Sequence, residues 1–203
     1  PMAAATHETS PHPVTHHTST GIDSRKIMMW IFLASECLFF GALISTYLIF
    51  KGQSLQGPEP HEILNIPVTS ASTFVLLMSS LTMVLAVYGA QHGRLGMMKL
   101  MLLATILLGL GFLGFQAYEF TSFIHEGLTI RTNLFGSSFF TLTGFHGVHV
   151  TVGIIMLMAL VGMLKAERVP GDKAEVVELI GLYWHFVDIV WILIFTLVYL
   201  IPS

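Results

Sequence analysis

The segment LYWHFVDIVW, residues 182–191, places an imidazole and a carboxyl group inside an apolar run. His185 and Asp188 are three residues apart, so a helix would put them on neighbouring positions of one face. Moving an ionised Asp to the centre of a bilayer costs about 2.5 to 3.5 kcal/mol, so Asp188 must face protein, headgroups or water, or else be protonated. We interpret the flanking Trp184 and Trp191 as packing residues, because nothing in the sequence offers a redox centre for them to connect.

A second carboxyl group, Glu36, lies in the segment WIFLASECLFFGALISTY. At the helical rise of 1.5 Å per residue it lies about 13 to 14 Å beyond Ile27, close to the middle of the hydrocarbon layer. Without a partner at that depth Glu36 would be largely protonated and reactive toward apolar carboxyl reagents. Two interpretations stay open: a contact for protons or lipid headgroups, and a neutral Glu that is hydrogen-bonded to a neighbouring helix.

The segment SSFFTLTGFHGVHVTVG carries small residues on one face, which suits tight helix packing. They are Ser137, Thr141, Gly144, Gly147 and Thr151. His146 and His149 lie on nearly the opposite face and could be ligands, proton carriers or hydrogen-bonded core residues. They share one level of the helix, which disfavours two haems held near opposite membrane surfaces. We favour hydrogen bonding to Glu36 or Asp188, across helices or through water or lipid.

Glu119 follows Gln116 by three residues in the segment FQAYEF. It comes near the end of its apolar run, so we expect it at the outer membrane interface and hydrated. The glycines that precede it indicate close approach of helices, not chemistry. They are Gly109, Gly111 and Gly114.

These side chains need membrane-spanning helices to position them. Of the 203 residues 54% are hydrophobic and 10% are charged, whereas soluble domains carry about 25% charged residues. Each apolar run is long enough to cross about 30 Å of hydrocarbon. The sequence therefore predicts an all-α, polytopic membrane helix bundle, residues 26–203. Its five helices are expected at Ile27–Phe50, Pro67–Tyr88, Met97–Phe120, Gly136–Leu164 and Glu178–Ile201.

Residues 1–25 have no apolar periodicity and are predicted to form a disordered tail without a cleavable signal peptide. The spacing of the histidines in this tail fits no compact metal site, and we expect no metal ligands in the chain. Its single cysteine, Cys37, cannot form an internal disulfide.

The positive residues predict the orientation of the helices. Seven Lys and Arg residues fall on the side of the N-terminus, namely Arg25, Lys26, Arg94, Lys99, Lys165, Arg168 and Lys173. The other side has Lys51 and Arg131. This difference predicts a cytoplasmic N-terminus and an outer C-terminus in a bacterial cytoplasmic membrane.

The sequence lacks the patterns of a phosphate-binding glycine loop, HExxH, CxxC, CxxCH and GxSxG. Intramembrane carboxyl and imidazole groups without a catalytic constellation fit an accessory subunit or a small transporter. Transporters often show internal repeats and broken helices, and neither is evident here. The accessory subunit is therefore favoured, and a proton-coupled transporter that uses Glu36 and Asp188 is the alternative.

Four segments in order, LASECLFF, FQAYEF, GSSFFTLTGFHGVHV and YWHFVDIVW, resemble subunit III of haem-copper respiratory oxidases. The resemblance covers Ile27 to Tyr199 and corresponds to the last five helices of the seven-helix long form, as in the shorter bacterial form. It implies that Glu36 is the carbodiimide-reactive carboxylate of the family. His146, His149, His185 and Asp188 would be polar positions near a lipid cleft.

The resemblance further implies a non-redox subunit that binds phospholipid and supports proton uptake and durability of the catalytic subunit. Haem and copper would belong to partner subunits, with oxidase subunit I, subunit II and small subunits in one complex, and no nucleic acid is expected. Quinol oxidases of the family tend to have Asp where this chain has Glu36. We therefore expect a cytochrome c oxidase, with a quinol oxidase as the alternative.

Overall fold

The structure is a computed structural model that describes residues 24–51, 66–167 and 173–201. Within these ranges five helices are long and apolar enough to cross a membrane, as predicted. The predicted core of each span is confirmed, and the helices extend beyond it by one to five residues at most ends. The helices are α1 (Ser24–Phe50), α3 (Ile66–Gln91), α4 (Leu95–His125), α5 (Leu134–Lys165) and α6 (Lys173–Phe195), with a π-helical turn η1 (Thr196–Leu200) completing the last span.

Particular residues end α3 and begin α5 at the turns between the helices. Gly93 adopts a left-handed φ of 66° between α3 and α4, a conformation that costs glycine least. The Arg94 amide then donates to the carbonyl of Gly89 at 2.8 Å. Asn133 caps α5 by accepting a hydrogen bond from the Gly136 amide at 2.6 Å. These tight turns make α3, α4 and α5 antiparallel neighbours.

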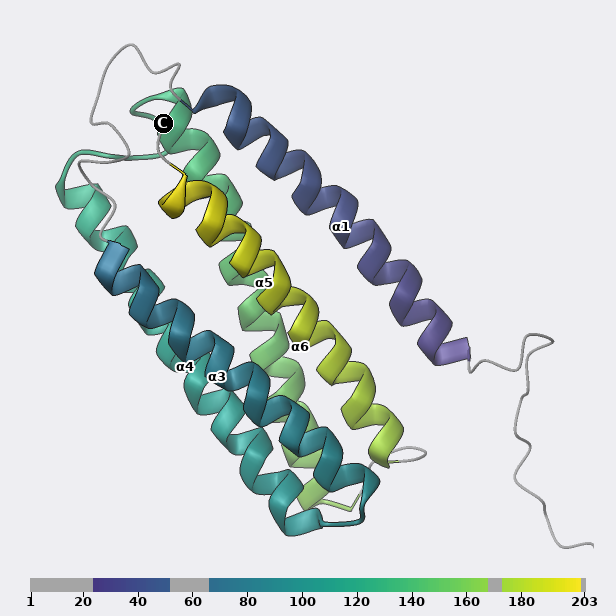
Figure 1. Cartoon of the computed structure of the whole chain (residues 1–203). Helices are drawn as coiled ribbons and strands as arrows, with labels where there is room; N and C mark the ends of the chain where they lie inside the picture. The colour runs from purple at the N-terminus through teal and green to yellow at the C-terminus, as the bar shows by residue number, and fades with distance from the viewer. Residues whose placement is uncertain (1–23, 52–65, 168–172, 202–203) are drawn as a thin grey trace, which may run out of the picture.

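The bundle is uneven, because α6 lies at its centre and α1 at its edge (Figure 1). In the most apolar window of each helix, half of the α6 residues but only 11% of the α1 residues are buried within the chain. α3 packs along α4 and α6, and α1 packs mainly against α5 and α6. Most of the α1 surface is therefore left for lipid or another protein.

Trp184 of α6 fills the space between α4 and α5. A Cβ added at Gly109 would lie 2.8 Å from the indole, and one at Gly153 would lie 2.9 Å from it. The small-residue face predicted for α5 does not pack tightly against another helix of this chain at Gly144. Nothing lies within 4 Å of a Cβ added there. The prediction of tight packing on this face was wrong for this bundle, except at Gly147, which faces the side chain of Gln116.

Polar contacts tie α1 to α6 at both ends. At the end where α1 begins, the Lys26 ammonium lies 3.0 Å from the Glu178 carboxylate. At the other end the Lys51 ammonium donates to the carbonyl groups of Ile201 at 2.6 Å and Leu197 at 3.2 Å. Partial burial lowers the pKa of this ammonium from its ordinary value. Lys51 thus caps the carbonyl end of the last span.

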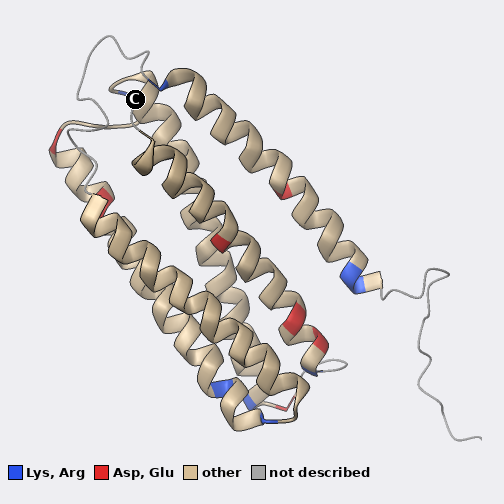
Figure 2. Ribbon diagram, viewed as in Figure 1, with Lys and Arg blue, Asp and Glu red and all other residues tan. Residues whose placement is uncertain are grey.

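Lys and Arg residues lie toward the ends of the helices, whereas acidic residues also occur midway along α1 and α6 (Figure 2). The described Lys and Arg residues that were assigned to the N-terminal side share one end of the bundle, where α1, α4 and α6 begin and α3 and α5 end. Arg168 lies outside the described residues, as do residues 1–23 of the predicted tail. Ser24 and Arg25, predicted to belong to that tail, are helical.

Candidate functional site

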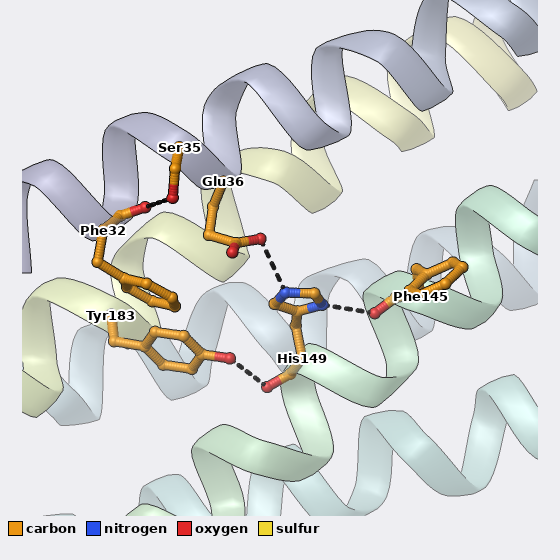
Figure 3. Close-up of polar contacts among 6 residues, drawn as sticks. All are labelled: Phe32, Ser35, Glu36, Phe145, His149 and Tyr183. Carbon is orange, nitrogen blue, oxygen red and sulfur yellow. Dashed lines mark hydrogen bonds and ion pairs between the residues drawn. The ribbon is translucent and has the colours of Figure 1, made fainter.

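Glu36 and His149 meet between α1 and α5 (Figure 3). The Nε2 atom of His149 lies 3.1 Å from Oε2 of Glu36, and Nδ1 of the same ring lies 2.7 Å from the Phe145 carbonyl oxygen. Both residues sit near the midpoint of their helices. The sequence prediction that a histidine of this segment bonds Glu36 is therefore confirmed for His149.

This geometry fixes how protons are distributed in the pair. A carbonyl oxygen can only accept, so Nδ1 of His149 must carry a proton. If the ring is neutral, Nε2 accepts the proton of a neutral Glu36; if the ring is charged, Nε2–H donates to an ionised Glu36. Either arrangement places one proton between the two groups and leaves the pair with no net charge, which suits its depth in the bilayer.

Aromatic rings surround the pair. The ring of Phe40 lies edge-on to the His149 ring, with centroids 4.9 Å apart, and Phe39 lies 6.3 Å away. The Tyr183 hydroxyl donates to the His149 carbonyl oxygen at 3.0 Å, which ties α6 to the same turn of α5 (Figure 3). The side chains of Glu36 and His149 retain 19% and 15% exposure. A small apolar reagent could therefore reach the pair from the face of α1.

His146 has a different environment from His149, although the residues are one helical turn apart. Its ring is fully buried, stacks on Trp191 at 4.8 Å and meets Phe112 edge-on at 5.8 Å. Neither ring nitrogen has a hydrogen-bond partner among the described residues. A direct hydrogen bond from His146 to Glu36 or Asp188, one form of the expected contact, does not form, because the turn of α5 directs this ring into an aromatic core.

His185 and Asp188 do not pair with either histidine of α5. Nδ1 of His185 lies 2.7 Å from the Ser80 hydroxyl oxygen, which comes from α3. Asp188 is 4% exposed, and its carboxyl group interacts with the same hydroxyl. Its two oxygens have no hydrogen-bond partner among the described residues. α3 therefore supplies the polar partner that sequence reasoning sought on α5.

Glu119 is buried, contrary to the expectation of a hydrated carboxylate at the interface. It is 4% exposed and accepts a hydrogen bond from the Thr69 hydroxyl of α3. The Tyr199 hydroxyl also interacts with Thr69. α4 continues past the predicted end at Phe120 to His125, so Glu119 lies nearly two turns before the end of the helix.

Sequence reasoning missed the hydroxyl groups of α3. Thr73 and Ser79 accept the indole N–H groups of Trp191 and Trp184, each at 3.0 Å. The Thr69 hydroxyl donates to Glu119, and the Ser80 hydroxyl forms a hydrogen bond with Nδ1 of His185. Thr73 and Ser80 are seven residues apart and Thr69 is four before Thr73, a spacing that places them on one helix face. Hydroxyl groups on one face of an otherwise apolar helix could have predicted that a neighbouring helix carries polar partners for them.

No group of three or more His, Cys, Asp or Glu side chains lies close enough to hold a metal ion within the described ranges. The carboxyl and imidazole groups discussed above occur instead in separate contacts: Glu36 with His149, His185 with Ser80, and Glu119 with Thr69. Each joins two helices. These contacts can hold or share protons and can orient neighbouring helices.

Fold and site together define a polytopic helix bundle that buries a proton-sharing carboxyl–imidazole pair between two membrane-spanning helices. Comparison with known proteins gives the family. The profile of the family described as cytochrome c oxidase subunit III matches residues 8–203. The chain belongs to this family.

Its relatives include both kinds of oxidase. The chain is 37% identical over 195 residues to a cytochrome c oxidase subunit 3 from Bacillus sp. (strain PS3), which covers 96% of this chain and 94% of the relative. It is also 37% identical over 199 residues to a quinol oxidase subunit 3 from Bacillus subtilis (strain 168), covering 98% and 97%. A cytochrome c oxidase subunit 3 of that same strain is 37% identical over 200 residues, covering 98% and 95%. Overall identity therefore does not separate the two donors.

Proposed function

We propose that this chain is the non-redox third subunit of a proton-pumping cytochrome c oxidase in a bacterial cytoplasmic membrane. The observation that carries the proposal is the 3.1 Å contact between Glu36 and His149. It brings together two of the four segments on which the resemblance rests, at the depth where an unpaired charge is most costly. Haem and copper then belong to the catalytic partners, subunits I and II.

The Glu at position 36 supports cytochrome c over quinol as the donor. The quinol oxidases of the family tend to have Asp at this place, and the longer Glu side chain is the one that reaches His149 here. Quinol remains the competing donor, because the chain is 37% identical both to a cytochrome c oxidase subunit 3 and to a quinol oxidase subunit 3. In either complex the proposed role of this chain is to stabilise the catalytic subunit and to support its uptake of protons.

Bound phospholipid is part of the proposed role. A groove of about 170 Å³ opens between α1 and α5 on the half of the bundle away from Lys26, and mixes apolar with hydroxyl side chains. It is lined by residues that include Leu43, Thr46, Phe50, Leu134, Ser137 and Thr141. The loosely packed α1 could lie over part of an acyl chain in this groove.

The orientation of the chain is likewise a proposal. The end of the bundle that carries Lys26, Arg94 and Lys173 would face the cytoplasm, by the rule that positive residues remain inside. The N-terminus would then be cytoplasmic and the C-terminus outside. Accessibility of single cysteines introduced at Arg94 and Arg131, probed with a membrane-impermeant reagent in sealed cells, would test it: only the cysteine at Arg131 should react.

The experiment that tests the proposed function is purification of the tagged chain in mild detergent. We expect haem bands in the reduced-minus-oxidised spectrum, together with the large oxidase subunit, and oxygen consumption with reduced cytochrome c. Consumption with quinol alone would assign the chain to a quinol oxidase. A preparation without haem or partner subunits would overturn the accessory role and favour a transporter.

The lipid part of the proposal has a separate test. Thr141→Phe should fill the groove between α1 and α5 and lower the phospholipid that the purified complex retains. Thr151→Phe is the matched control, since Thr151 is an exposed residue of the same helix that does not line the groove. Equal retention in the two variants would contradict this lipid site.

A further inference from the structure

The polar groups of α3 and α6 form a path from a surface groove to a buried carboxyl group. A groove of about 280 Å³ opens between these two helices at the end of the bundle that carries Lys26. Its polar lining includes Glu178 at the start of α6, Gln91 at the end of α3, and His185 deeper in the bilayer. From His185 the contacts continue inward through Ser80 to Asp188.

The step from His185 to Ser80 has a defined geometry. His185 is partly buried, lines the groove, and makes its described hydrogen bond through Nδ1, at 2.7 Å from the Ser80 oxygen. The Ser80 hydroxyl also interacts with the Asp188 carboxyl group. Asp188 is 4% exposed, and neither of its oxygens has a hydrogen-bond partner within the described part of the chain. A buried carboxyl group with unused acceptors is costly unless it takes up a proton or a ligand.

We propose that Ser80, His185 and Asp188 form a proton relay, which binds a proton from the groove at the buried carboxyl group of Asp188. With Asp188 ionised, Nδ1–H of His185 donates to Ser80 and the Ser80 hydroxyl donates to the carboxylate. When a proton reaches Nε2 from the groove, the Nδ1 proton passes to the Ser80 oxygen and the Ser80 proton passes to Asp188. The result is one proton gained, a neutral carboxyl group and a neutral His185 that now carries its proton on Nε2.

The relay is separate from the Glu36 pair. Other titratable groups around it are Glu178 and Tyr88 in the groove, and Lys26 of α1, which pairs with Glu178. α5 packs on α6 with His146, whose ring stacks on Trp191, and with His149, which bonds Glu36. α4 presents Phe112 to Trp191. The proposed relay therefore does not include the proton that Glu36 and His149 share.

The relay goes beyond the proposed function, since it resides in this chain alone and does not depend on the electron donor. Infrared difference spectra of the purified complex between acid and alkaline pH should show the carboxylic C=O stretch of a protonated Asp. Asp188→Asn should remove this band, whereas Glu36→Gln should leave it. Absence of a pH-dependent band that Asp188→Asn removes would overturn the relay.

Ser80→Ala provides a second test that does not depend on Asp188→Asn assembling. Without the hydroxyl, the Asp188 proton should exchange with D₂O more slowly by about tenfold or more, which converts to about 1.4 kcal/mol of barrier. Ser79→Ala is the matched control, because Ser79 is the adjacent hydroxyl of α3 and serves the Trp184 indole instead. Equal exchange rates in the two variants would exclude Ser80 as the relay group. Neither result bears on whether the chain copurifies with haem.

Discussion

The Nε2 atom of His149 and the Oε2 atom of Glu36, 3.1 Å apart, join α5 to α1 halfway along both helices. α1 buries little of its surface within the chain, so this bond and the polar contacts at both ends of α1 contribute to its attachment. Because Nδ1 of the same ring bonds the Phe145 carbonyl, the imidazole has a fixed orientation toward Glu36. The pair is thus both a proton site and an interhelical contact.

Glu36→Gln should abolish carbodiimide labelling of the chain while most oxidase activity remains. The amide cannot form the reactive adduct, but its NH₂ group can still donate to Nε2 of His149. Labelling is measured by mass spectrometry of the α1 peptide, and activity by oxygen consumption. Glu119→Gln is the control and should leave labelling unchanged, because Glu119 is 4% exposed. Complete loss of activity in Glu36→Gln would instead place Glu36 on an obligatory proton path.

His149→Phe should speed carbodiimide labelling of Glu36 and weaken the attachment of α1. Without the imidazole, the Glu36 carboxyl group loses its hydrogen-bond partner and is left free to react with the reagent. Leaving one buried polar group unsatisfied costs about 1 to 3 kcal/mol, so the subunit should dissociate from the heated complex at a lower temperature. Both effects are read from one preparation.

The control for this change is His92→Phe, at the exposed end of α3. His92 directly follows α3 and bonds the carbonyl of Tyr88 in the last turn of that helix, so its loss should alter neither labelling nor dissociation. If His149→Phe behaved like His92→Phe in both measurements, the bond to Glu36 would have no role in the assembled complex.

The spans and their order were predictable from the sequence, but most partners in the core were not. The length of an apolar run sets how far a helix extends in the membrane, which is why the predicted range Ile27–Phe50 nearly matches α1. Contacts between helices depend on how each helix is rotated. An apolar span without a strong polar face does not specify that rotation, since lipid and protein interiors are similarly apolar.

Glu119 and Asp188 illustrate this limit. Depth alone assigned Glu119 to the interface, whereas α4 continues to His125 and Thr69 covers the carboxyl group. Asp188 was expected near a histidine of α5, whereas α6 turns it toward Ser80 of α3. Of the two partners considered for the histidines of α5, Glu36 was the correct one for His149.

Gly153→Ala should destabilise the bundle, although alanine favours helix. The new Cβ would lie 2.9 Å from the Trp184 ring and 3.3 Å from Tyr183, and overpacking of this kind costs about 1 to 3 kcal/mol. That exceeds the gain of up to about 1 kcal/mol in helix propensity. The fraction of subunit retained in the complex after heating in detergent should fall. Gly162→Ala, in the same helix with open space around it, should leave retention unchanged or raise it.

Thr69→Val should loosen the contact of α3 with α4 near the end of the bundle away from Lys26. The substitution keeps the side-chain shape but removes the hydroxyl that donates to Glu119 and interacts with Tyr199. A buried carboxyl group then lacks its donor, at a cost of about 1 to 3 kcal/mol. Thr46→Val is the control, since Thr46 is exposed on α1 and bonds the Ala42 carbonyl of its own helix.

Combining Thr69→Val with Glu119→Leu tests whether the cost arises from the unsatisfied carboxyl group. With both polar partners replaced by apolar ones, no buried acceptor is left without a donor, so the double variant should be retained in the heated complex better than Thr69→Val alone. Additive losses from the two changes would show that Thr69 stabilises α3 through other contacts. In that case the hydrogen bond to Glu119 would contribute little to holding the two helices together.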